Sequence, residues 1–183
     1  TRGTLVGSLC HADPQGDWAS VMLALGGSVV ATSARGRRTI PVGEFVVGTF
    51  QNALEYDEIA VEAVVPAAQG ARSGSYLKLE RRVGDFATAG VAVALESVGE
   101  EVVRAGIALT GVGPATIAAT EAAQTLVGSR LDPDVVDRAA DLAAAVARPR
   151  TDHRGTADYK RIVVATFVRR ILTAERAPAG AAA

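Results

Sequence analysis

The stretch TAGVAVALESVGEEVVRAGIALT, residues 88–110, decides the fold of the second half of this chain. Small and branched apolar residues run through 88–97 and again through 101–110, a composition typical of β-strands. Only Val98-Gly99-Glu100 separates the two runs, which is short enough for a tight turn, so the strands form an antiparallel hairpin. Residues 75–81 precede the hairpin and predict a third strand.

Helical patterns follow the three strands. An Ala-rich segment at 116–127 ends at a glycine, and an Asp-Pro pair at 132–133 is a strong start for a helix that runs to about residue 146. A last helix is expected at 158–174. Its predicted apolar stripe is Tyr159, Ile162, Val163, Phe167 and Ile171, with Lys160, Arg161, Arg169 and Arg170 facing elsewhere.

The first third of the chain mixes short helices and strands. Residues 17–25 predict a buried helix, and 28–32 with 37–42 predict a β-pair turned at 33–36. A helical turn is expected at 44–47. Residues 59–65 alternate and stop at a proline, which indicates a strand with one buried face, formed by Ile59, Val61, Ala63 and Val65.

The small, polar stretch 67–74 is the expected domain junction. The resulting fold class is α+β: a first unit at 1–68, then a three-stranded antiparallel sheet packed on a three-helix bundle at 72–176. Residues 177–183 are expected to form a disordered tail.

Composition and residue counts exclude several classes of function. The formal net charge of −1 over 183 residues argues against a nucleic-acid protein driven by bulk charge. Cys10 is the only cysteine and His11 and His153 the only histidines, so no intrachain disulfide, iron–sulfur cluster or thiolate zinc site is expected. With no signal peptide and no transmembrane segment in the sequence, a reducing, cytoplasmic setting is expected, with the inner face of a membrane reached only through partners.

Three regions carry polar groups that suit ligand chemistry. Residues 3–8 form a glycine-containing stretch with two hydroxyls, which either cradles a phosphate or only reverses the chain. Asp17 is either a helix cap or an acceptor for ligand hydroxyls. Tyr76, Lys78 and Glu80 share one strand face, which holds a ring or a phosphate or is simply a solvated basic strand.

Basic charge also gathers near the C-terminus. Eight Lys/Arg residues lie between 148 and 176, and they form either an interaction surface for another subunit or a solvated helix face.

Five ordered motifs resemble the FAD-binding medium subunit of molybdenum hydroxylases of the xanthine dehydrogenase and carbon monoxide dehydrogenase type. They cover nearly the whole chain. They are Thr4-Leu5-Val6-Gly7-Ser8, Pro14-Gln15-Gly16-Asp17, the strand 58–66 that ends in proline, Lys78-x-x-Arg81-Arg82-x-Gly84-Asp85-x-Ala87, and the helix start 155–161, where Lys160 replaces the usual arginine.

The resemblance implies a role for individual residues. The first motif, Thr4, Leu5, Val6, Gly7 and Ser8, would wrap the FAD pyrophosphate. Asp17 would contact the ribityl or phosphate region, Ile59 and Ala60 would offer backbone groups near the flavin, and Lys78 with Tyr76 would flank the isoalloxazine ring.

The resemblance also implies partners: a large molybdopterin subunit and a small [2Fe–2S] subunit that pass electrons to FAD and then to an external acceptor. Two features favour a second hypothesis, a flavin-free docking subunit of such a complex. Val6 stands where the family has glycine, and the chain opens on the second flavin motif, so we expect a fragment that lacks the family's N-terminal FAD subdomain.

Overall fold

A four-stranded antiparallel sheet organises the C-terminal half of the chain in the computed structural model, which describes residues 3–176. The strands β6 (Ala71–Leu79), β7 (Ala89–Val98), β8 (Glu101–Thr110) and β9 (Ile117–Ala118) pair in that order. The expected β7–β8 hairpin is confirmed, with Val98 opposite Glu101. The third expected strand is β6, although it begins four residues before residue 75.

The expectation of a three-stranded sheet is wrong by one strand. Ile117 and Ala118 pair with Leu109 and Ala108 instead of opening a helix, and the amide of Ala119 donates to the carbonyl of Ile107 at 2.9 Å. The exposed edge of β8 outcompetes the helix propensity of this Ala-rich segment, because local propensity is a weak preference. The helix predicted at 116–127 is therefore only α4 (Thr120–Gln124).

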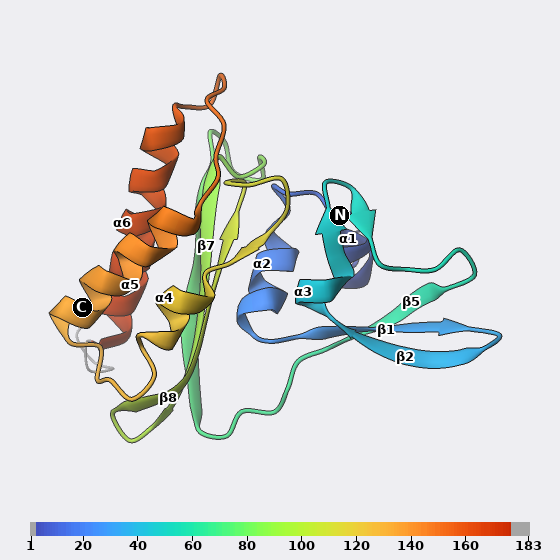
Figure 1. Ribbon diagram of the computed structural model, residues 1–183, viewed down its shortest axis with the longest axis horizontal. Helices are drawn as coiled ribbons and strands as arrows, with labels where there is room; N and C mark the ends of the chain where they lie inside the picture. Colours follow the sequence, from blue (N-terminus) through green and yellow to red (C-terminus); the bar gives the residue numbers. More distant parts are fainter. Residues whose placement is uncertain (1–2, 177–183) are drawn as a thin grey trace.

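Three helices cover one face of the sheet, as predicted: α4, α5 (Pro133–Val146) and α6 (Ala157–Arg176) (Figure 1). The start of α5 follows from its sequence, since Pro133 opens the helix and the carbonyl of Asp132 accepts from the amides of Val135 and Val136, both at 3.0 Å. The core between helices and sheet is built from aliphatic residues, among them Val91, Leu95, Leu109, Leu126, Val164, Val168 and Leu172.

The apolar stripe predicted for α6 is partly wrong. Tyr159 and Ile162 are exposed, whereas Val164, Val168 and Leu172 are buried, so the buried face is rotated from the predicted one. The helix also buries Lys160, which was predicted to lie off the apolar stripe, and the exposed fraction of this residue is 3%. The reason is a local partner: the turn before the helix brings Asp152 and a backbone carbonyl to the ammonium group.

A helix from the first part of the chain covers the other face of the sheet. This helix, α2 (Asp17–Ala24), packs on β7 and β8 through Ala24, Ala92 and Ala108. A Cβ at Gly106 would overlap the carbonyl oxygen of Ala24, so only glycine allows the helix to come this close. The predicted helix at 17–25 is confirmed, and the sheet is covered on both faces (Figure 1).

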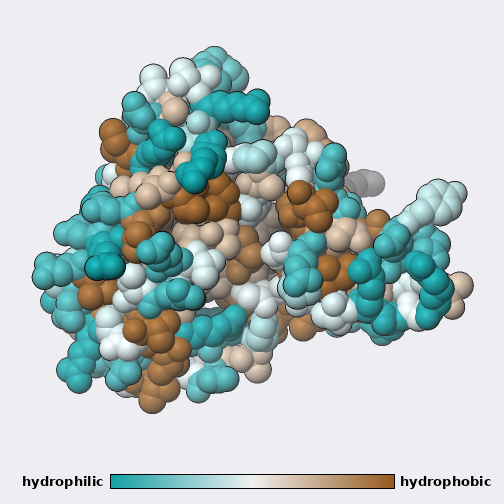
Figure 2. All heavy atoms as spheres, in the orientation of Figure 1, coloured by the Kyte–Doolittle hydropathy of each residue, from teal (hydrophilic) through white to brown (hydrophobic). Residues whose placement is uncertain are grey.

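A second, three-stranded sheet forms the arm seen on the right of Figure 1, in the order β2-β1-β5. The predicted pair β1 (Ser28–Ser33) and β2 (Gly36–Pro41) is confirmed, as is β5 (Ile59–Val64). Figure 2 shows that the far end of this arm is hydrophilic. The remaining elements are α1 (Leu5–His11), α3 (Val42–Phe45), β3 (Val46–Gly48) and β4 (Gln51–Asn52).

The buried face predicted for β5 is partly wrong, because Ala63 packs inward as expected but Ile59 and Val61 do not. Ile59 and Val61 are 68% and 48% exposed, while Ala60 and Ala63 pack on the core formed with α1 and α2. This pattern of exposure has two causes. The strand β5 lies at the edge of its sheet. A bulge shifts its register against β1 between Val30 and Ala31, so the core-facing positions do not alternate along β5.

Among residues 3–176, no helix is both long and apolar enough to cross a bilayer, and no group of three or more His, Cys, Asp or Glu could hold a metal ion. The tail predicted to be disordered, 177–183, lies outside the described residues.

Candidate functional site

The glycine-containing stretch at 3–8 leads into a helix and does not form the turn expected from the sequence. Thr4 caps α1, and its Oγ1 accepts from the amide of Gly7 at 3.0 Å. A Cβ on Gly7 would lie 2.8 Å from Thr4 Oγ1, so the glycine keeps the first turn open. Val6 is half-buried and Gly7 is exposed. The first turn of a helix leaves amide N–H groups without partners inside the helix, which is a setting that suits an anion.

The structure brings Asp17, Tyr76 and Lys78 together, although 59 residues separate the first two. Tyr76 Oη donates to Asp17 Oδ1 at 2.9 Å, and Lys78 Nζ donates to Asp17 Oδ2 at the same distance. Lys78 Nζ also lies 3.1 Å from Glu80 Oε2. The side chain of Lys78 is only 17% exposed, so the alternative of a solvated basic strand is wrong. Gly16 is the N-cap of α2, so Asp17 is the first residue of the helix, and its carboxylate contacts Tyr76 and Lys78 of β6.

Two buried hydroxyl groups extend this cluster, and sequence reasoning missed both. Thr110 Oγ1 lies 3.2 Å from Tyr76 Oη and within hydrogen-bond distance of Ser20 Oγ. Ser20 and Thr110 are fully buried. No sequence signal marks them, because their relation to Tyr76 depends on the pairing register of the sheet and on the position of α2.

The environment of the cluster changes the proton affinities of its groups. Burial, and to a lesser extent the negative charge of Asp17, raise the pKa of the Tyr76 phenol far above its ordinary value, against an opposing hydrogen bond from Thr110. Burial acts to lower the pKa of Lys78, but hydrogen bonds to Asp17 and Glu80 outweigh it, so this pKa is raised. At neutral pH the cluster therefore holds a neutral phenol and an ammonium group.

A loop after β6 is fastened to the same cluster. Lys78 Nζ donates to the carbonyl of Asp85 at 3.1 Å, and Arg154 Nη1 donates to the carbonyl of Phe86 at 2.7 Å. The amide of Gly84 donates to Glu80 Oε2 at 3.2 Å. These contacts join residues of the Lys-x-x-Arg-Arg-x-Gly-Asp-x-Ala motif that are apart in the sequence.

The predicted site residues fall into two groups. Thr4, Leu5, Val6, Gly7 and Ser8 lie on α1, which packs against the strand that carries Ile59 and Ala60. Asp17, Tyr76 and Lys78 form the other group. Within residues 3–176, no hydrogen bond or ion pair joins the two groups.

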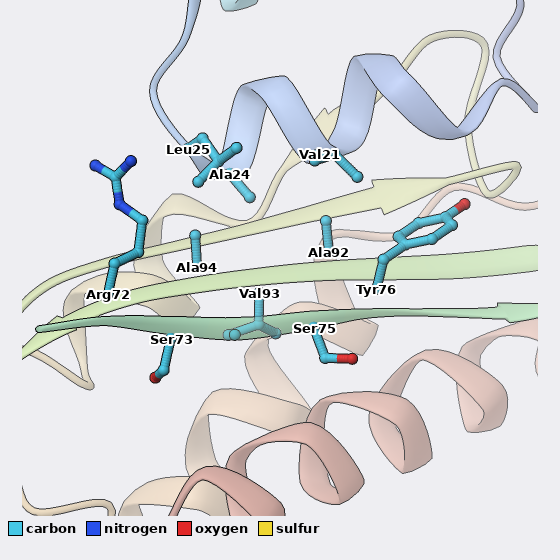
Figure 3. A pocket seen from close by; sticks show the side chains of 11 residues that line it. Val21, Ala24, Leu25, Arg72, Ser73, Ser75, Tyr76, Ala92, Val93 and Ala94 are labelled. Atoms are coloured by element: carbon cyan, nitrogen blue, oxygen red, sulfur yellow. The ribbon is translucent and has the colours of Figure 1, made fainter. Parts of the chain in front are cut away.

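A cavity of about 360 Å³ adjoins the second group, between α2 and the strands β6 and β7 (Figure 3). Val21 of α2 and Leu25, just after its end, face Ala92 and Ala94 of the sheet across the cavity. Tyr76 and Arg72 lie toward its opposite ends. Arg72 is paired with Glu96 at 2.7 Å. The cavity is thus a mostly apolar slot with the Tyr76 ring as part of its wall.

The basic residues near the C-terminus do not form one patch. Lys160 is buried against Asp152, and Arg169 lies within 2.6 Å of Asp137 and 2.7 Å of Asp141 on α5. Part of the basic charge is therefore neutralised inside the chain.

The sequence matches two family descriptions in succession. Residues 74–174 match the CO dehydrogenase flavoprotein C-terminal domain, and residues 1–68 match the FAD binding domain in molybdopterin dehydrogenase. The chain belongs to the CO dehydrogenase flavoprotein family. This membership confirms the resemblance drawn from the five motifs.

Two proteins of known name are similar to this chain. The carbon monoxide dehydrogenase medium chain of Hydrogenophaga pseudoflava is 38% identical over 94% of this chain and 60% of its own length. The nicotine 6-hydroxylase medium subunit of Paenarthrobacter nicotinovorans is 34% identical, over 93% of this chain and 60% of its own. The chain therefore spans about 60% of the length of these relatives.

Solved structures share the fold. Carbon monoxide dehydrogenase from Hydrogenophaga pseudoflava superposes with a TM-score of 0.90 at 39% identity, over 96% of this chain and 62% of the other. Quinoline 2-oxidoreductase from Pseudomonas putida 86 superposes with a TM-score of 0.84 at 31% identity, over 96% and 61% of the two chains.

Proposed function

We propose that this chain forms part of an FAD site in a molybdenum-containing oxidoreductase, as the medium subunit or a portion of it. The membership of the chain in the CO dehydrogenase flavoprotein family supports this proposal, and so does the convergence of Asp17, Tyr76 and Lys78 from α2 and β6. In such a complex, a large molybdopterin subunit and a small [2Fe–2S] subunit would deliver electrons, and a reducing cytoplasmic setting suits the assembly.

The residues present fit part of an FAD molecule. The first turn of α1 offers amide N–H groups to a diphosphate, with the hydroxyls of Thr4 and Ser8 beside them. Gly7 is exposed and has no side chain, so a ligand can approach the backbone closely there.

The second group suits the flavin end of the molecule. Lys78 presents a positive charge and Tyr76 an aromatic ring and a neutral phenol, both held by the same carboxylate. Bound FAD would supply reversible electron storage, while this chain binds and orients it. Asp17, already committed to two donors, acts as the support for Tyr76 and Lys78. Ile59 and Ala60 would add backbone groups from β5.

The variant Lys78→Ala tests this proposal. Titration of the full chain with FAD, followed by flavin fluorescence and absorbance, is expected to show weaker binding in the variant than in the wild type. Arg35→Ala is a matched control, because Arg35 lies on the β1–β2 turn and its ion pair is with Asp57, far along the arm. Equal FAD affinity and equal flavin spectra in the wild type and Lys78→Ala would contradict the role of Lys78.

A flavin-free docking subunit is the second candidate function, favoured by Val6 at a position where the family has glycine. Thermal unfolding of the wild-type chain with and without FAD distinguishes the FAD-binding function from the docking function. A ligand that binds only the folded state at 100 times its Kd stabilises the protein by about 2.7 kcal/mol and raises its Tm. An unchanged Tm at saturating FAD would support the docking function for this chain.

A further inference from the structure

The phenol of Tyr76 lies in a row of hydrogen-bonding groups that crosses from α2 to the sheet. Ser20 Oγ contacts Thr110 Oγ1, Thr110 Oγ1 lies 3.2 Å from Tyr76 Oη, and Tyr76 Oη lies 2.9 Å from Asp17 Oδ1. Lys78 holds the other carboxylate oxygen at 2.9 Å. The row begins at a fully buried hydroxyl and ends at a partly exposed ion pair.

The direction of each hydrogen bond in this row follows from the group at one end, the Asp17 carboxylate. An ionised carboxylate only accepts, so the single proton of the phenol must go to Asp17. The phenol oxygen then accepts from Thr110, and the oxygen of Thr110 accepts from Ser20. A single assignment of donors and acceptors therefore satisfies Ser20, Thr110, Tyr76 and Asp17, and in it the phenol proton goes to Asp17.

The sheet register creates the space for this row. Gly90 pairs with Lys78 on one side and with Thr110 on the other, so Thr110 is level with Lys78, and the Tyr76 side chain passes over Gly90 to reach it. A Cβ at Gly90 would lie 2.6 Å from Tyr76 Oη and 3.1 Å from the Cβ of Thr110. The absent side chain at position 90 therefore lets the phenol reach Thr110 and Asp17 together.

We propose that Thr110, supported by Ser20, is a positioning residue that fixes the Tyr76 phenol against Asp17 and thereby sets the aromatic wall of the proposed flavin site. The part of this inference that concerns the flavin site rests on the proposed function. The fully buried hydroxyl of Thr110 contacts the phenol, and Ser20 contacts Thr110. Removal of the Thr110 hydroxyl leaves the phenol oxygen without its donor and lets the ring adopt other orientations.

Carbon-13 NMR of the full chain, labelled at the Cζ of tyrosine, tests the positioning directly. The three tyrosines, Tyr56, Tyr76 and Tyr159, are assigned with single Tyr→Phe variants. Thr110→Val, which keeps the shape and removes the hydroxyl, is expected to move the Tyr76 resonance, and Thr110→Ser is expected to restore it. Thr88→Val is the matched control, since Thr88 is a buried threonine with no hydrogen bond to the phenol.

Ser20→Ala provides a second variant that acts on the phenol only through Thr110. It is expected to move the same resonance by a smaller amount, and near-ultraviolet circular dichroism checks that each variant keeps its fold. A Tyr76 resonance that stays in place in both Thr110→Val and Ser20→Ala would overturn the inference. This outcome is independent of whether FAD binds.

FAD titration of the same variants tests the step that reaches the flavin. One net hydrogen bond corresponds to a change in affinity of about fivefold, and we expect this loss in Thr110→Val and recovery in Thr110→Ser. If the wild-type chain binds no FAD, the proposed function fails while the NMR result still decides the positioning. A shifted resonance with unchanged FAD affinity would overturn the role of Thr110 in the flavin site.

Discussion

Lys160 and Asp152 form an ion pair in which the ammonium group is buried and the carboxylate reaches the surface. The Nζ and Oδ2 atoms lie 2.7 Å apart, and the exposed fractions of the two side chains are 3% and 36%. The carbonyl of Arg150 accepts a second hydrogen bond from the ammonium group at 3.0 Å. This pair anchors the start of α6 to the segment that precedes it.

The first prediction concerns the difference in burial between Lys160 and Asp152. Asp152→Asn leaves a charged group buried without its counter-ion, so we expect the free energy of unfolding to fall by about 1–3 kcal/mol. Lys160→Met removes the charge and keeps an apolar stem of similar length, and it should cost less. Urea unfolding measures both values. Equal losses in the two variants would show that the buried charge is not the source of the cost.

The second prediction concerns the contact between α2 and the sheet. Gly106→Ala places a methyl group on the carbonyl of Ala24 and forces the helix outward, so we expect a loss of about 1–3 kcal/mol in the free energy of unfolding. Gly43→Ala is the control, since its nearest neighbour is a flexible leucine tip at 3.4 Å. A stable Gly106→Ala variant would mean that α2 packs less closely than the structure shows.

The third prediction concerns acid stability. Hydrogen bonds from Arg72 and from the amide of Gln69 lower the pKa of Glu96 to about 2. Because this pKa is depressed in the folded state, the stabilisation by Glu96 is present above its ordinary pKa and is lost as the pH falls toward 2. Glu96→Gln should flatten the dependence of Tm on pH in this acidic window. An unaltered slope in the variant would exclude Glu96 as its origin.

The fourth prediction concerns Asp17. Asp17→Asn weakens the hold on both Tyr76 and Lys78, so we expect the free energy of unfolding at pH 7 to fall by about 1–3 kcal/mol. Glu44→Gln, an exposed acid in the first turn of α3, is the control and should change stability little. If both variants unfold at the same urea concentration as the wild type, Asp17 does not fasten α2 to β6.

Much of the fold follows from the sequence. The β7–β8 hairpin, the β1–β2 pair and the start of α5 depend on neighbours in the chain, and each is confirmed. The strand β9 was missed because its partner is the edge of β8, which local propensity does not reveal. The buried Lys160 was missed for a similar reason, since its partner lies in a turn outside the helix.

The candidate site also has a part that the sequence predicts and a part that only the structure reveals. Residue types and motif order pointed to Asp17, Tyr76 and Lys78, and the structure brings these three together. Whether they bind a flavin stays a prediction. The hydroxyls of Ser20 and Thr110 depend on the register between three strands and on the height of α2 above the sheet. Those distances are set by tertiary packing, so sequence periodicity does not predict them.

The placement of α2 has a consequence for how the chain unfolds. The two family matches divide at residues 68 and 74, yet the helix that shields the alanine-lined side of the C-terminal sheet belongs to the first match. Cutting the polypeptide at this boundary would expose that side of the sheet to water. We therefore expect one cooperative transition for the whole chain, in which the evolutionary boundary is not a thermodynamic one.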